Sequence, residues 1–309
     1  MKTGEKGEGV VDSGDTVAES APAKLNLWLA VTGRRDDGFH LLDSLFHFTR
    51  FGDRISVAPA SRSAVSPGPD LTITGPFADA LRPASHDNLV SRAVCVLARH
   101  LGRAPDVSVR LDKRVPVAAG LGGGSADAAA ALRAVNRLWG QPVDGATLAR
   151  LGATLGADVP ACLAATPQWV GGIGDRLTPA ALDWSGAVVL VNPGVALSTG
   201  AVFQGFRDEG RFAPALSDAA RAAIAADPGA LAGAGGNSLE PAARRLCPAV
   251  DRVLAALGWQ TAARLVRMSG SGATCFALFD RPGDAEAAAD RLRRAAPDWW
   301  VVASPLVAG

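Results

Sequence analysis

Residues 116–127 read Pro116-Val117-Ala118-Ala119-Gly120-Leu121-Gly122-Gly123-Gly124-Ser125-Ala126-Asp127 and run directly into the alanine-rich segment 128–139. This pattern predicts a glycine-dense turn that feeds a helix. Glycine costs about 0.5–1 kcal/mol relative to alanine inside regular structure, so its density here indicates that backbone comes close to another group. A helix N-terminus also gathers unpaired N–H groups and partial positive charge. The stretch therefore predicts a cradle for phosphate.

The spacing excludes the two common phosphate-binding motifs. A P-loop needs Lys followed by Ser or Thr after its last glycine, and here Ser125 follows Gly124 directly. The dinucleotide motif G-x-G-x-x-G needs a glycine at a position that Ser125 or Asp127 occupies. The alternative is a tight turn that closes the helix against a strand, with Ser125 as its N-cap. The phosphate cradle is favoured over this alternative.

Composition limits the classes of function. The chain has 309 residues, enough for one large or two medium domains. A formal net charge of +1 with 20% charged residues gives no electrostatic reason to expect nucleic acid or a membrane surface as partner. No apolar signal segment follows Met1, and no apolar run is long enough for a membrane span. The cysteines are far apart, which indicates reduced thiols in a cytoplasmic protein.

The opening of the chain is expected to be a tail followed by strands. Residues 1–20 are mostly Gly and polar residues and predict a disordered tail. Residues 21–31 alternate apolar and polar side chains, which puts Lys24 and Asn26 on one face of a strand. That face can meet a ligand, although for Lys24 alone a solvated edge strand is the simpler interpretation. Two more strands are expected within residues 39–57, with a break at Phe51-Gly52-Asp53.

The segments before the glycine-rich stretch have the order of a nucleotide site. Asp87 or Asn88 is expected to cap a helix that reaches about His100, and a short strand follows at 107–111. A basic turn that contains Lys113 then leads into the glycines. Such a turn can approach a nucleotide, but exposed basic turns are usually only solvated. Both interpretations stay open for Lys113.

Asp158 follows the helix that is expected over residues 144–155. It lies in an otherwise apolar run, and Pro160 prevents a simple backward continuation of any helix that starts there. An acid in this setting is either a helix cap or a functional carboxylate. The residues alone leave these two possibilities equal.

The second half of the chain predicts another α+β unit, with helices on one face of an antiparallel sheet. Residues 169–177 are expected to form a connector. The expected strands are 187–192, 263–268, 274–279 and 299–303, and the expected helices are 199–206, 216–226, 238–257 and 284–295.

Three stretches resemble the three-motif arrangement of the GHMP kinase superfamily. They are Ala23 to Leu27, Pro116 to Asp127 and Ser269 to Ala273. The resemblance runs from about residue 21 to the end of the chain. It implies a two-domain α+β fold, with a ribosomal protein S5 domain 2-like N-terminal domain at 21–167 and a ferredoxin-like C-terminal domain at 168–309.

Within the superfamily, four motifs are similar to those of the kinases that phosphorylate the 2-hydroxyl of 4-diphosphocytidyl-2-C-methyl-D-erythritol: Pro22 to Leu27, Asp36 to His40, Gly120 to Ser125 and Leu155 to Pro160. With Ser269 to Ala273, five separate motifs thus agree in the same order. The resemblance implies ATP as phosphate donor, Mg²⁺, and a small-molecule substrate with a cytidine diphosphate group, in the non-mevalonate route to isoprenoid precursors. Lys24 and Asp158 would be the catalytic pair: the carboxylate accepts the hydroxyl proton, and the ammonium compensates charge on the transferred group. Asn26 would contact substrate or Asp158. Phosphoryl transfer needs this kind of positioning and charge compensation more than a strong base.

The resemblance also assigns binding residues. The hydroxyl of Ser125 would lie near phosphate or Mg²⁺, and the other residues expected to bind ATP are Asn88, Leu89, Lys113, Pro116, Gly120, Leu121, Gly122, Gly123 and Gly124. His40 would read the cytosine edge, with Phe39 and Phe203 stacking on the base. The family usually has Tyr where this chain has Phe39, but stacking needs only the face of the ring. It often has Glu at the position of Gly171.

Three other functions are alternatives to this one. A mevalonate, homoserine or sugar kinase shares the phosphate cradle, but the motif with Phe39 and His40 favours a cytidine-bearing substrate. A non-catalytic nucleotide-binding protein would not need Lys24 and Asp158 together. A purely structural α+β protein would leave the agreement of five separate motifs unexplained.

Overall fold

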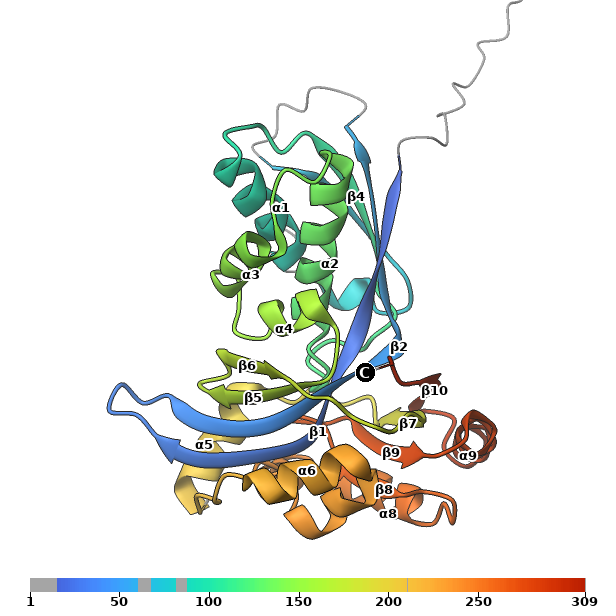
Figure 1. Cartoon of the computed structure of the whole chain (residues 1–309). Helices are drawn as coiled ribbons and strands as arrows, with labels where there is room; N and C mark the ends of the chain where they lie inside the picture. Colours follow the sequence, from blue (N-terminus) through green and yellow to red (C-terminus); the bar gives the residue numbers. More distant parts are fainter. Residues whose placement is uncertain (1–15, 61–67, 82–87, 210, 309) are drawn as a thin grey trace, which may run out of the picture.

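The computed structural model describes residues 16–60, 68–81, 88–209 and 211–308. Two long antiparallel strands, β1 (Val17–Arg34) and β2 (His40–Pro59), run through both halves of the molecule (Figure 1). They belong to a six-stranded sheet with the order β3-β4-β2-β5-β6, in which β1 pairs with β2. A second, antiparallel sheet has the order β10-β7-β9-β8. The fold is thus α+β with two sheets, as expected.

The remaining elements follow in chain order. The strands are β3 (Asp70–Thr74), β4 (Val107–Asp112), β5 (Gln168–Gly172), β6 (Arg176–Pro179), β7 (Ala187–Asn192), β8 (Leu265–Met268), β9 (Cys275–Phe279) and β10 (Trp300–Pro305). The helices are α1 (Leu89–His100), α2 (Gly123–Leu138), α3 (Gly145–Ala153), α4 (Val159–Ala164), α5 (Thr199–Glu209), α6 (Asp218–Ala226), the 3₁₀ helix η2 (Pro228–Ala234), α7 (Glu240–Leu246), α8 (Ala249–Gly258) and α9 (Pro282–Ala295). None of these helices is long and apolar enough to cross a membrane.

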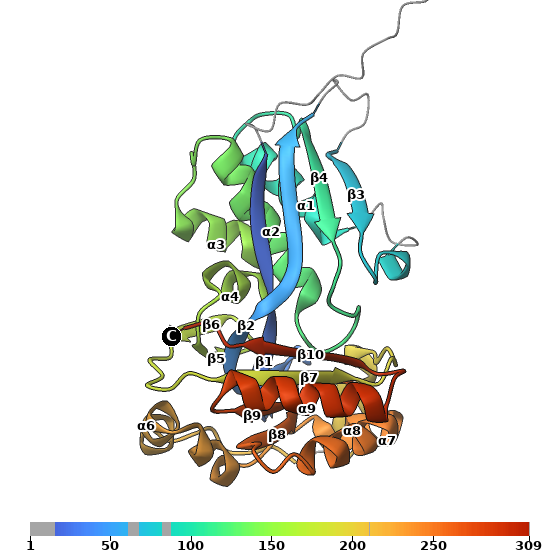
Figure 2. The same cartoon turned by 90° about the vertical axis from the view of Figure 1, so that its right-hand side faces the viewer.

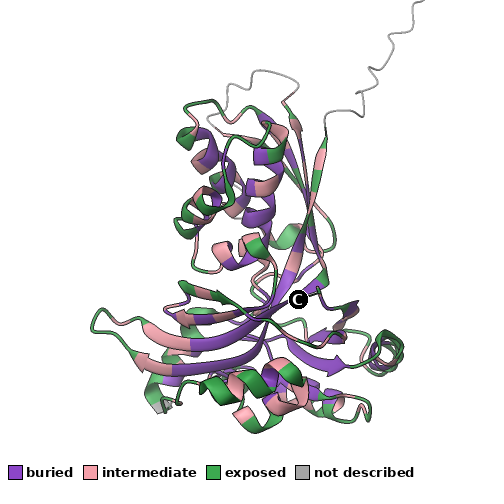
Figure 3. Ribbon diagram, in the orientation of Figure 1, coloured by how far each residue is buried: buried purple, intermediate pink, exposed green. Residues whose placement is uncertain are grey.

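Helices α1 to α4 gather on one side of the first sheet, with α2 against β1 and β2 (Figures 1 and 3). The side chains of Ala128 to Ala131 in α2 are fully buried. Alanine is the best helix former and its small side chain lets neighbouring elements approach closely. The alanine run therefore makes α2 a central helix, and its N-terminus is fixed where the glycine loop enters.

The second sheet is covered on both faces, because alternate residues of a strand point to opposite sides. In β7, Val189 and Val191 pack into a core with α5 and α7 to α9, whereas Val188 and Leu190 pack into a core with β1. Helix α9 lies across this sheet in Figure 2. The part of β1 that carries Lys24 and Asn26 therefore packs against the second sheet, which places these two residues at the junction of the two halves.

The expected tail is wrong for residues 17–20, which form the start of β1 and pair with residues 54–57. Glu19 in this segment makes ion pairs with Arg133, at 3.2 Å, and with Arg137. These partners lie far away in the sequence, so the polar composition of the segment gave no sign of them. Residues 1–15 of the expected tail lie outside the described residues.

The expected break in β2 is also absent, because the strand continues through Gly52. Gly52 is the register partner of Pro22, and a Cβ at this position would overlap the carbonyl oxygen of Ala21. The missing side chain thus permits a close approach of β1 to β2. A glycine that the sequence suggested as a strand breaker serves strand pairing instead.

Two other expected elements differ from the structure. Residues 169–177 are no connector, because they belong to the hairpin of β5 and β6, and β5 pairs with Leu42 to Phe46 of β2. The helix expected over 238–257 is split into α7 and α8 around Pro248, which has no N–H to continue the first helix. Since β5 and β6 extend the first sheet beyond residue 167, the division into domains at 21–167 and 168–309 stays a prediction.

Candidate active site

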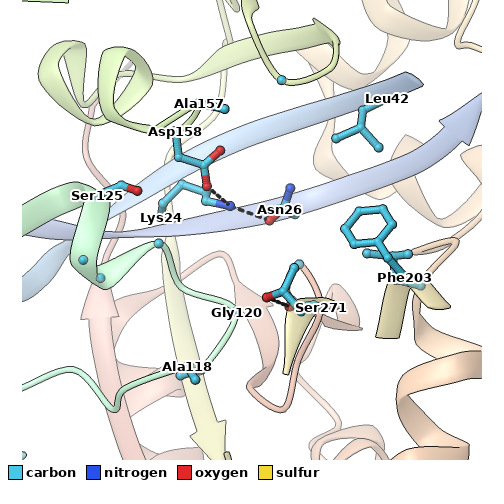
Figure 4. A pocket seen from close by; sticks show the side chains of 18 of the residues that line it. Lys24, Asn26, Leu42, Ala118, Gly120, Ser125, Ala157, Asp158, Phe203 and Ser271 are labelled. Carbon is cyan, nitrogen blue, oxygen red and sulfur yellow. Dashed lines mark hydrogen bonds and ion pairs between the residues drawn. The ribbon is translucent and has the colours of Figure 1, made fainter. Parts of the chain in front are cut away.

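A cavity of about 1090 Å³ runs from the glycine loop past β1 to α5. Every residue expected from the sequence to bind or react lines it except Leu121, which is buried behind the loop. Figure 4 shows how Ser125, Lys24, Asn26 and Phe203 follow one another along the cavity. The structure therefore brings together motifs that are far apart in the sequence, with Lys24 and Ser271, 247 residues apart, both lining the cavity.

Lys24 and Asp158 form an ion pair in this cavity, with 3.2 Å between Nζ and Oδ2 (Figure 4). The register of β1 and β2 shifts between Pro22 and Lys24, and the Lys24 N–H donates to the carbonyl of Leu121 at 2.9 Å. The irregular strand is thus tied to the glycine loop at the residue that carries the ammonium. The Lys24 side chain is 7% exposed, so the ion pair is largely shielded from solvent.

Asp158 occupies the N-cap position of α4, but its side chain makes no capping hydrogen bond. Its carboxylate turns toward Lys24 instead and stays 32% exposed. Of the two roles that the sequence left open, the helix cap is therefore not used. The carboxylate is positioned by the start of α4 and remains accessible from the cavity.

Asn26 is oriented by a chain of hydrogen bonds. Its Oδ1 accepts from Lys24 Nζ at 2.9 Å, and its Nδ2 donates to Ser44 Oγ at 3.0 Å. Ser44 Oγ in turn donates to the carbonyl of Trp28 at 2.5 Å, which leaves Ser44 Oγ as acceptor for the amide. The amide oxygen is thereby directed at the ammonium. Lys24 also lies 4.2 Å from the centroid of the Phe46 ring, so its charge is compensated on several sides.

The glycine loop adopts a conformation that side chains would obstruct. Gly122 has φ +63° and is the N-cap of α2, and a Cβ there would lie 3.1 Å from Lys24 Cε. Helix α2 begins at Gly123, so Ser125 lies in its first turn and the alternative in which Ser125 is the N-cap is wrong. Gly123, Gly124 and Ser125 all line the cavity at this N-terminus. The arrangement suits the binding of phosphate oxygens.

Lys113 lines the cavity, but its ammonium is engaged in a buried cluster. Its Nζ lies 2.6 Å from Asp53 Oδ2 and 2.7 Å from Asp127 Oδ2, and the three side chains are at most 4% exposed. Burial lowers the pKa of Lys113, but the carboxylates of Asp127 and Asp53 outweigh burial and raise it. Burial raises the pKa of Asp127 to about 8. The Lys113 ammonium opposes this shift, and the Asp53 carboxylate adds to it. The ammonium of Lys113 is therefore engaged within the cluster, and the assignment of this residue to the ATP site stays a prediction.

Asp53 and Asp127 were missed by the sequence reasoning. The sequence pattern puts Asp53 in an expected strand break. It marks Asp127 only as the residue that stands where the dinucleotide motif needs a glycine. Asp53 Oδ1 accepts from the backbone N–H of Val115 at 2.8 Å, so the cluster ties the start of the glycine loop to β2. A Cβ at Gly123 would lie 3.0 Å from Lys113 Nζ. The cluster thus lies directly beneath the first turn of α2.

An aromatic group forms the other end of the cavity. The rings of His40 and Phe203 stack with centroids 5.0 Å apart, and Phe206 meets His40 edge-on at 5.8 Å. Phe39 lines the rim and is 59% exposed. In this arrangement the ring against Phe203 is that of His40, not that of Phe39.

His40 has a free hydrogen-bonding atom in this group. Its Nε2 is buried, and no described residue bonds it. Burial, followed by the positive charges of Arg207 and Arg34, lowers the pKa of His40. A neutral imidazole is thereby favoured, with one nitrogen as donor and the other as acceptor. Sequence reasoning missed Phe206, Arg34 and Arg207, which lie in no motif.

The described residues contain no cluster of three or more His, Cys, Asp or Glu side chains that could hold a metal ion. Mg²⁺ is often bound through one or two protein groups together with substrate phosphates, so such a cluster is not required. The Ser125 hydroxyl and the Asp158 carboxylate both line the cavity beside the first turn of α2. These oxygen donors fit a magnesium ion that arrives with a nucleotide.

Comparisons with known proteins show the family of the chain. Two family models match, GHMP kinases N terminal domain over residues 88–166 and GHMP kinases C terminal over residues 212–298. The 4-diphosphocytidyl-2-C-methyl-D-erythritol kinase of Mesorhizobium japonicum is 46% identical over 291 residues, which are 92% of this chain and 94% of the relative. The kinase of the same name from Dinoroseobacter shibae is 44% identical, over 97% of this chain and 98% of its own.

Solved structures give the same result. The crystal structure of a 4-(cytidine 5'-diphospho)-2C-methyl-D-erythritol kinase matches with a TM-score of 0.76 at 36% identity, covering 94% of this chain and 100% of the other. A homoserine kinase from Cytophaga hutchinsonii matches with a TM-score of 0.67 at 19% identity, over 97% of this chain and 100% of the other. The second match reflects a common fold alone.

Proposed function

The chain belongs to the GHMP kinases and, among them, to the 4-diphosphocytidyl-2-C-methyl-D-erythritol kinases, and we propose that it performs this reaction with Lys24 and Asp158. It is a small-molecule kinase that transfers a phosphoryl group from ATP to the 2-hydroxyl of 4-diphosphocytidyl-2-C-methyl-D-erythritol, in the non-mevalonate isoprenoid pathway. The observation that carries the assignment of residues is the ion pair of Lys24 and Asp158 between the glycine loop and the aromatic end of the cavity.

In the proposed mechanism, Asp158 orients the acceptor hydroxyl and accepts its proton as the bond to phosphorus forms. Lys24, held by Asn26 Oδ1 and by the carboxylate, compensates negative charge on the transferred group. The backbone at the start of α2 holds the phosphates of ATP. A magnesium ion near Ser125 would neutralise phosphate charge. Lys24 carries out its part without reorganisation, because its position is fixed before substrate arrives.

The acceptor would place its cytosine among the aromatic residues. The His40 Nε2 atom is free to hydrogen-bond a base edge, and the rings of Phe203 and Phe39 offer faces for stacking. Mevalonate and homoserine have no base to place there, so this end of the cavity favours the cytidine-bearing acceptor. A non-catalytic nucleotide binder is disfavoured because it would have no use for the accessible carboxylate of Asp158.

The direct test measures ADP release by the purified protein with Mg²⁺ and ATP. We expect turnover with 4-diphosphocytidyl-2-C-methyl-D-erythritol and none above background with mevalonate or homoserine. Turnover with another acceptor would leave the phosphate cradle in place and remove the assigned cytosine site. Nucleotide binding without any turnover would favour a non-catalytic role. The proposal includes a cytoplasmic location, in keeping with the four free cysteines.

Replacement of Phe203 by leucine tests the acceptor end. Loss of stacking on a base costs about 1–3 kcal/mol, so we expect KM for the cytidine-bearing acceptor to rise about 5- to 150-fold with KM for ATP unchanged. Phe206→Leu is the matched control, because Phe206 touches His40 but does not line the cavity. Equal effects of the two replacements would show that the aromatic group is only structural.

The pH dependence of acceptor binding tests the protonation of His40. Because burial, Arg207 and Arg34 lower its pKa from the ordinary 6.5, the imidazole stays neutral down to that pH and becomes charged only below it. We therefore expect KM for the acceptor to be flat above about pH 6.5 and to rise in more acidic solution. The rise should disappear in His40→Gln, which cannot titrate. A rise that begins near pH 8 would contradict a neutral His40.

A further inference from the structure

A second glycine-containing loop, residues 269–272, forms part of the cavity wall beside the glycine loop (Figure 4). Ser269 Oγ donates to the carbonyl of Gly120 at 2.9 Å and accepts from the N–H of Asn26 at 3.2 Å. A Cβ at Gly120 would collide with the carbonyl oxygen of Ser269. The two loops therefore interlock at the entrance to the phosphate cradle, so the conformation of one constrains the other.

Asn237 holds the second loop from the interior. This side chain is 4% exposed, and its Nδ2 donates to the carbonyls of Met268 at 3.0 Å and Gly270 at 2.7 Å. Its Oδ1 accepts from the N–H of Leu239 at 2.9 Å, so both ends of the amide are engaged. Asn237 also forms a bridge with Leu29 of β1. Its amide is therefore fixed in orientation relative to the strand that carries Lys24.

The hydrogen bond to Gly270 determines where the next N–H points. In a planar trans peptide the C=O and the following N–H point in opposite directions. Because the Gly270 carbonyl faces the buried Asn237, the N–H of Ser271 faces away from it, and Ser271 lines the cavity. Within the part of the chain that the structure describes, no acceptor bonds this N–H. It is thus a backbone donor, on a residue that lines the cavity, that no described residue engages.

We propose that Asn237 is a positioning residue, which fixes the Gly270–Ser271 peptide so that the Ser271 N–H donates to a phosphoryl oxygen of the bound substrates. This inference rests on the proposed function, because the kinase reaction supplies the anionic acceptor. Gly270 has φ +56°, and a Cβ there would lie 3.0 Å from the Gly120 carbonyl, so the loop conformation needs glycine and an external support. A donor oriented in advance stabilises developing charge without reorganisation.

Asn237→Asp tests the proposal kinetically. It keeps the size of the side chain and the acceptor for Leu239, but it turns the donor that holds Gly270 into a second oxygen. Removing one such oriented donor costs about 10²–10³-fold in kcat, and we expect a loss of that size. Asn136→Asp is the matched control: Asn136 is 6% exposed, donates to the Val143 carbonyl at 2.8 Å and does not line the cavity.

If Asn237 only stabilises the fold, Asn237→Asp and Asn136→Asp should both lose thermal stability and change kcat little. That result would overturn the proposal. We expect instead that only Asn237→Asp loses kcat when the two variants are compared below their melting temperatures. Asn237→Gln, which retains an amide donor on a longer side chain, is expected to recover part of the rate. Equal rates for the aspartate and glutamine variants would also contradict the proposal.

A spectroscopic measurement separates this inference from the proposed function. In protein labelled with ¹⁵N-serine, the Ser271 amide resonance should shift when Mg²⁺ and adenylyl imidodiphosphate are added with the cytidine-bearing acceptor. The shift should be lost in Asn237→Asp and kept in Asn136→Asp. If the wild type shows no shift, the inference fails. If the resonance shifts but the wild type does not phosphorylate the acceptor, the proposed function fails and the inference stands.

Discussion

Asp158→Ala is expected to lower kcat by about 10²–10⁴-fold, the range attributed to a positioned acid or base. The carboxylate lies 3.2 Å from Lys24 Nζ and is accessible from the cavity, and in the proposed mechanism it orients the acceptor hydroxyl. Affinity for ATP should change little, because the glycine loop and the first turn of α2 stay intact. Asp158→Asn, which keeps the shape and removes the charge, should be nearly as inactive.

The control for Asp158 is another aspartate at a helix N-cap. Asp144 begins α3, and its side chain accepts from the N–H of Thr147 at 2.8 Å, whereas Asp158 makes no such bond. Asp144→Ala should therefore lower Tm and leave kcat unchanged, and Asp158→Ala should do the reverse. Turnover by single-turnover kinetics and Tm by calorimetry measure both effects. Near wild-type turnover in Asp158→Ala would remove the assigned catalytic pair.

The motifs that could be predicted from the sequence are those whose residues are neighbours along the chain. The glycine loop and the helix after it predict a site formed by backbone N–H groups. At Gly120 and Gly122 any side chain would crowd its neighbours, so these positions need glycine. Lys24 and Asn26 were identified as neighbours on one strand face because strands alternate. Asp158 could not be assigned from its own surroundings, because the choice between cap and functional acid depends on Lys24, which lies 134 residues or so earlier in the chain.

The sequence reasoning failed where a residue is explained by a distant partner. Glu19 looks like part of a polar tail until Arg133 of α2 is brought beside it. Gly52 looks like a strand breaker until Ala21 of β1 approaches it. Lys113 looks like part of a solvated basic turn until Asp53 and Asp127 enclose it. Composition and periodicity describe neighbours along the chain, and these contacts arise only from folding.

Lys113→Met is expected to lower the free energy of unfolding by about 3–5 kcal/mol, because it leaves the buried Asp53 carboxylate without its cation. In a chain of this size the corresponding loss of Tm is on the order of 10 °C. The first turn of α2 rests on this cluster, since a Cβ at Gly123 would lie 3.0 Å from Lys113 Nζ. The affinity for ATP should therefore fall together with the stability. Urea unfolding and nucleotide titration measure the two losses.

The triple variant Lys113→Met, Asp53→Asn, Asp127→Asn separates two causes of the instability: a buried carboxylate without its cation, and the lost packing of the lysine side chain. It removes the three ionisable groups at similar volume, and a buried ion cluster replaced in this way is often neutral in stability. The amide of Asn at 53 can still accept from the N–H of Val115. We therefore expect the triple variant to recover most of the loss. Arg281→Met, at an ion pair whose arginine is 79% exposed, should have no measurable effect.

Asp127→Asn alone should be tolerated, and its pH dependence shows why. In the folded protein the pKa of Asp127 is raised from 3.8 to about 8, so the stability it contributes is full below pH 3.8 and is lost as the pH rises toward 8. Its Oδ1 is buried, and among the described residues it has no hydrogen-bond partner, so an amide loses little there. The variant should flatten the fall in stability between pH 4 and pH 8. If Asp127→Asn were instead as unstable as Lys113→Met at pH 7, Asp127 would be a fully charged partner of Lys113. That result would contradict the raised pKa of Asp127.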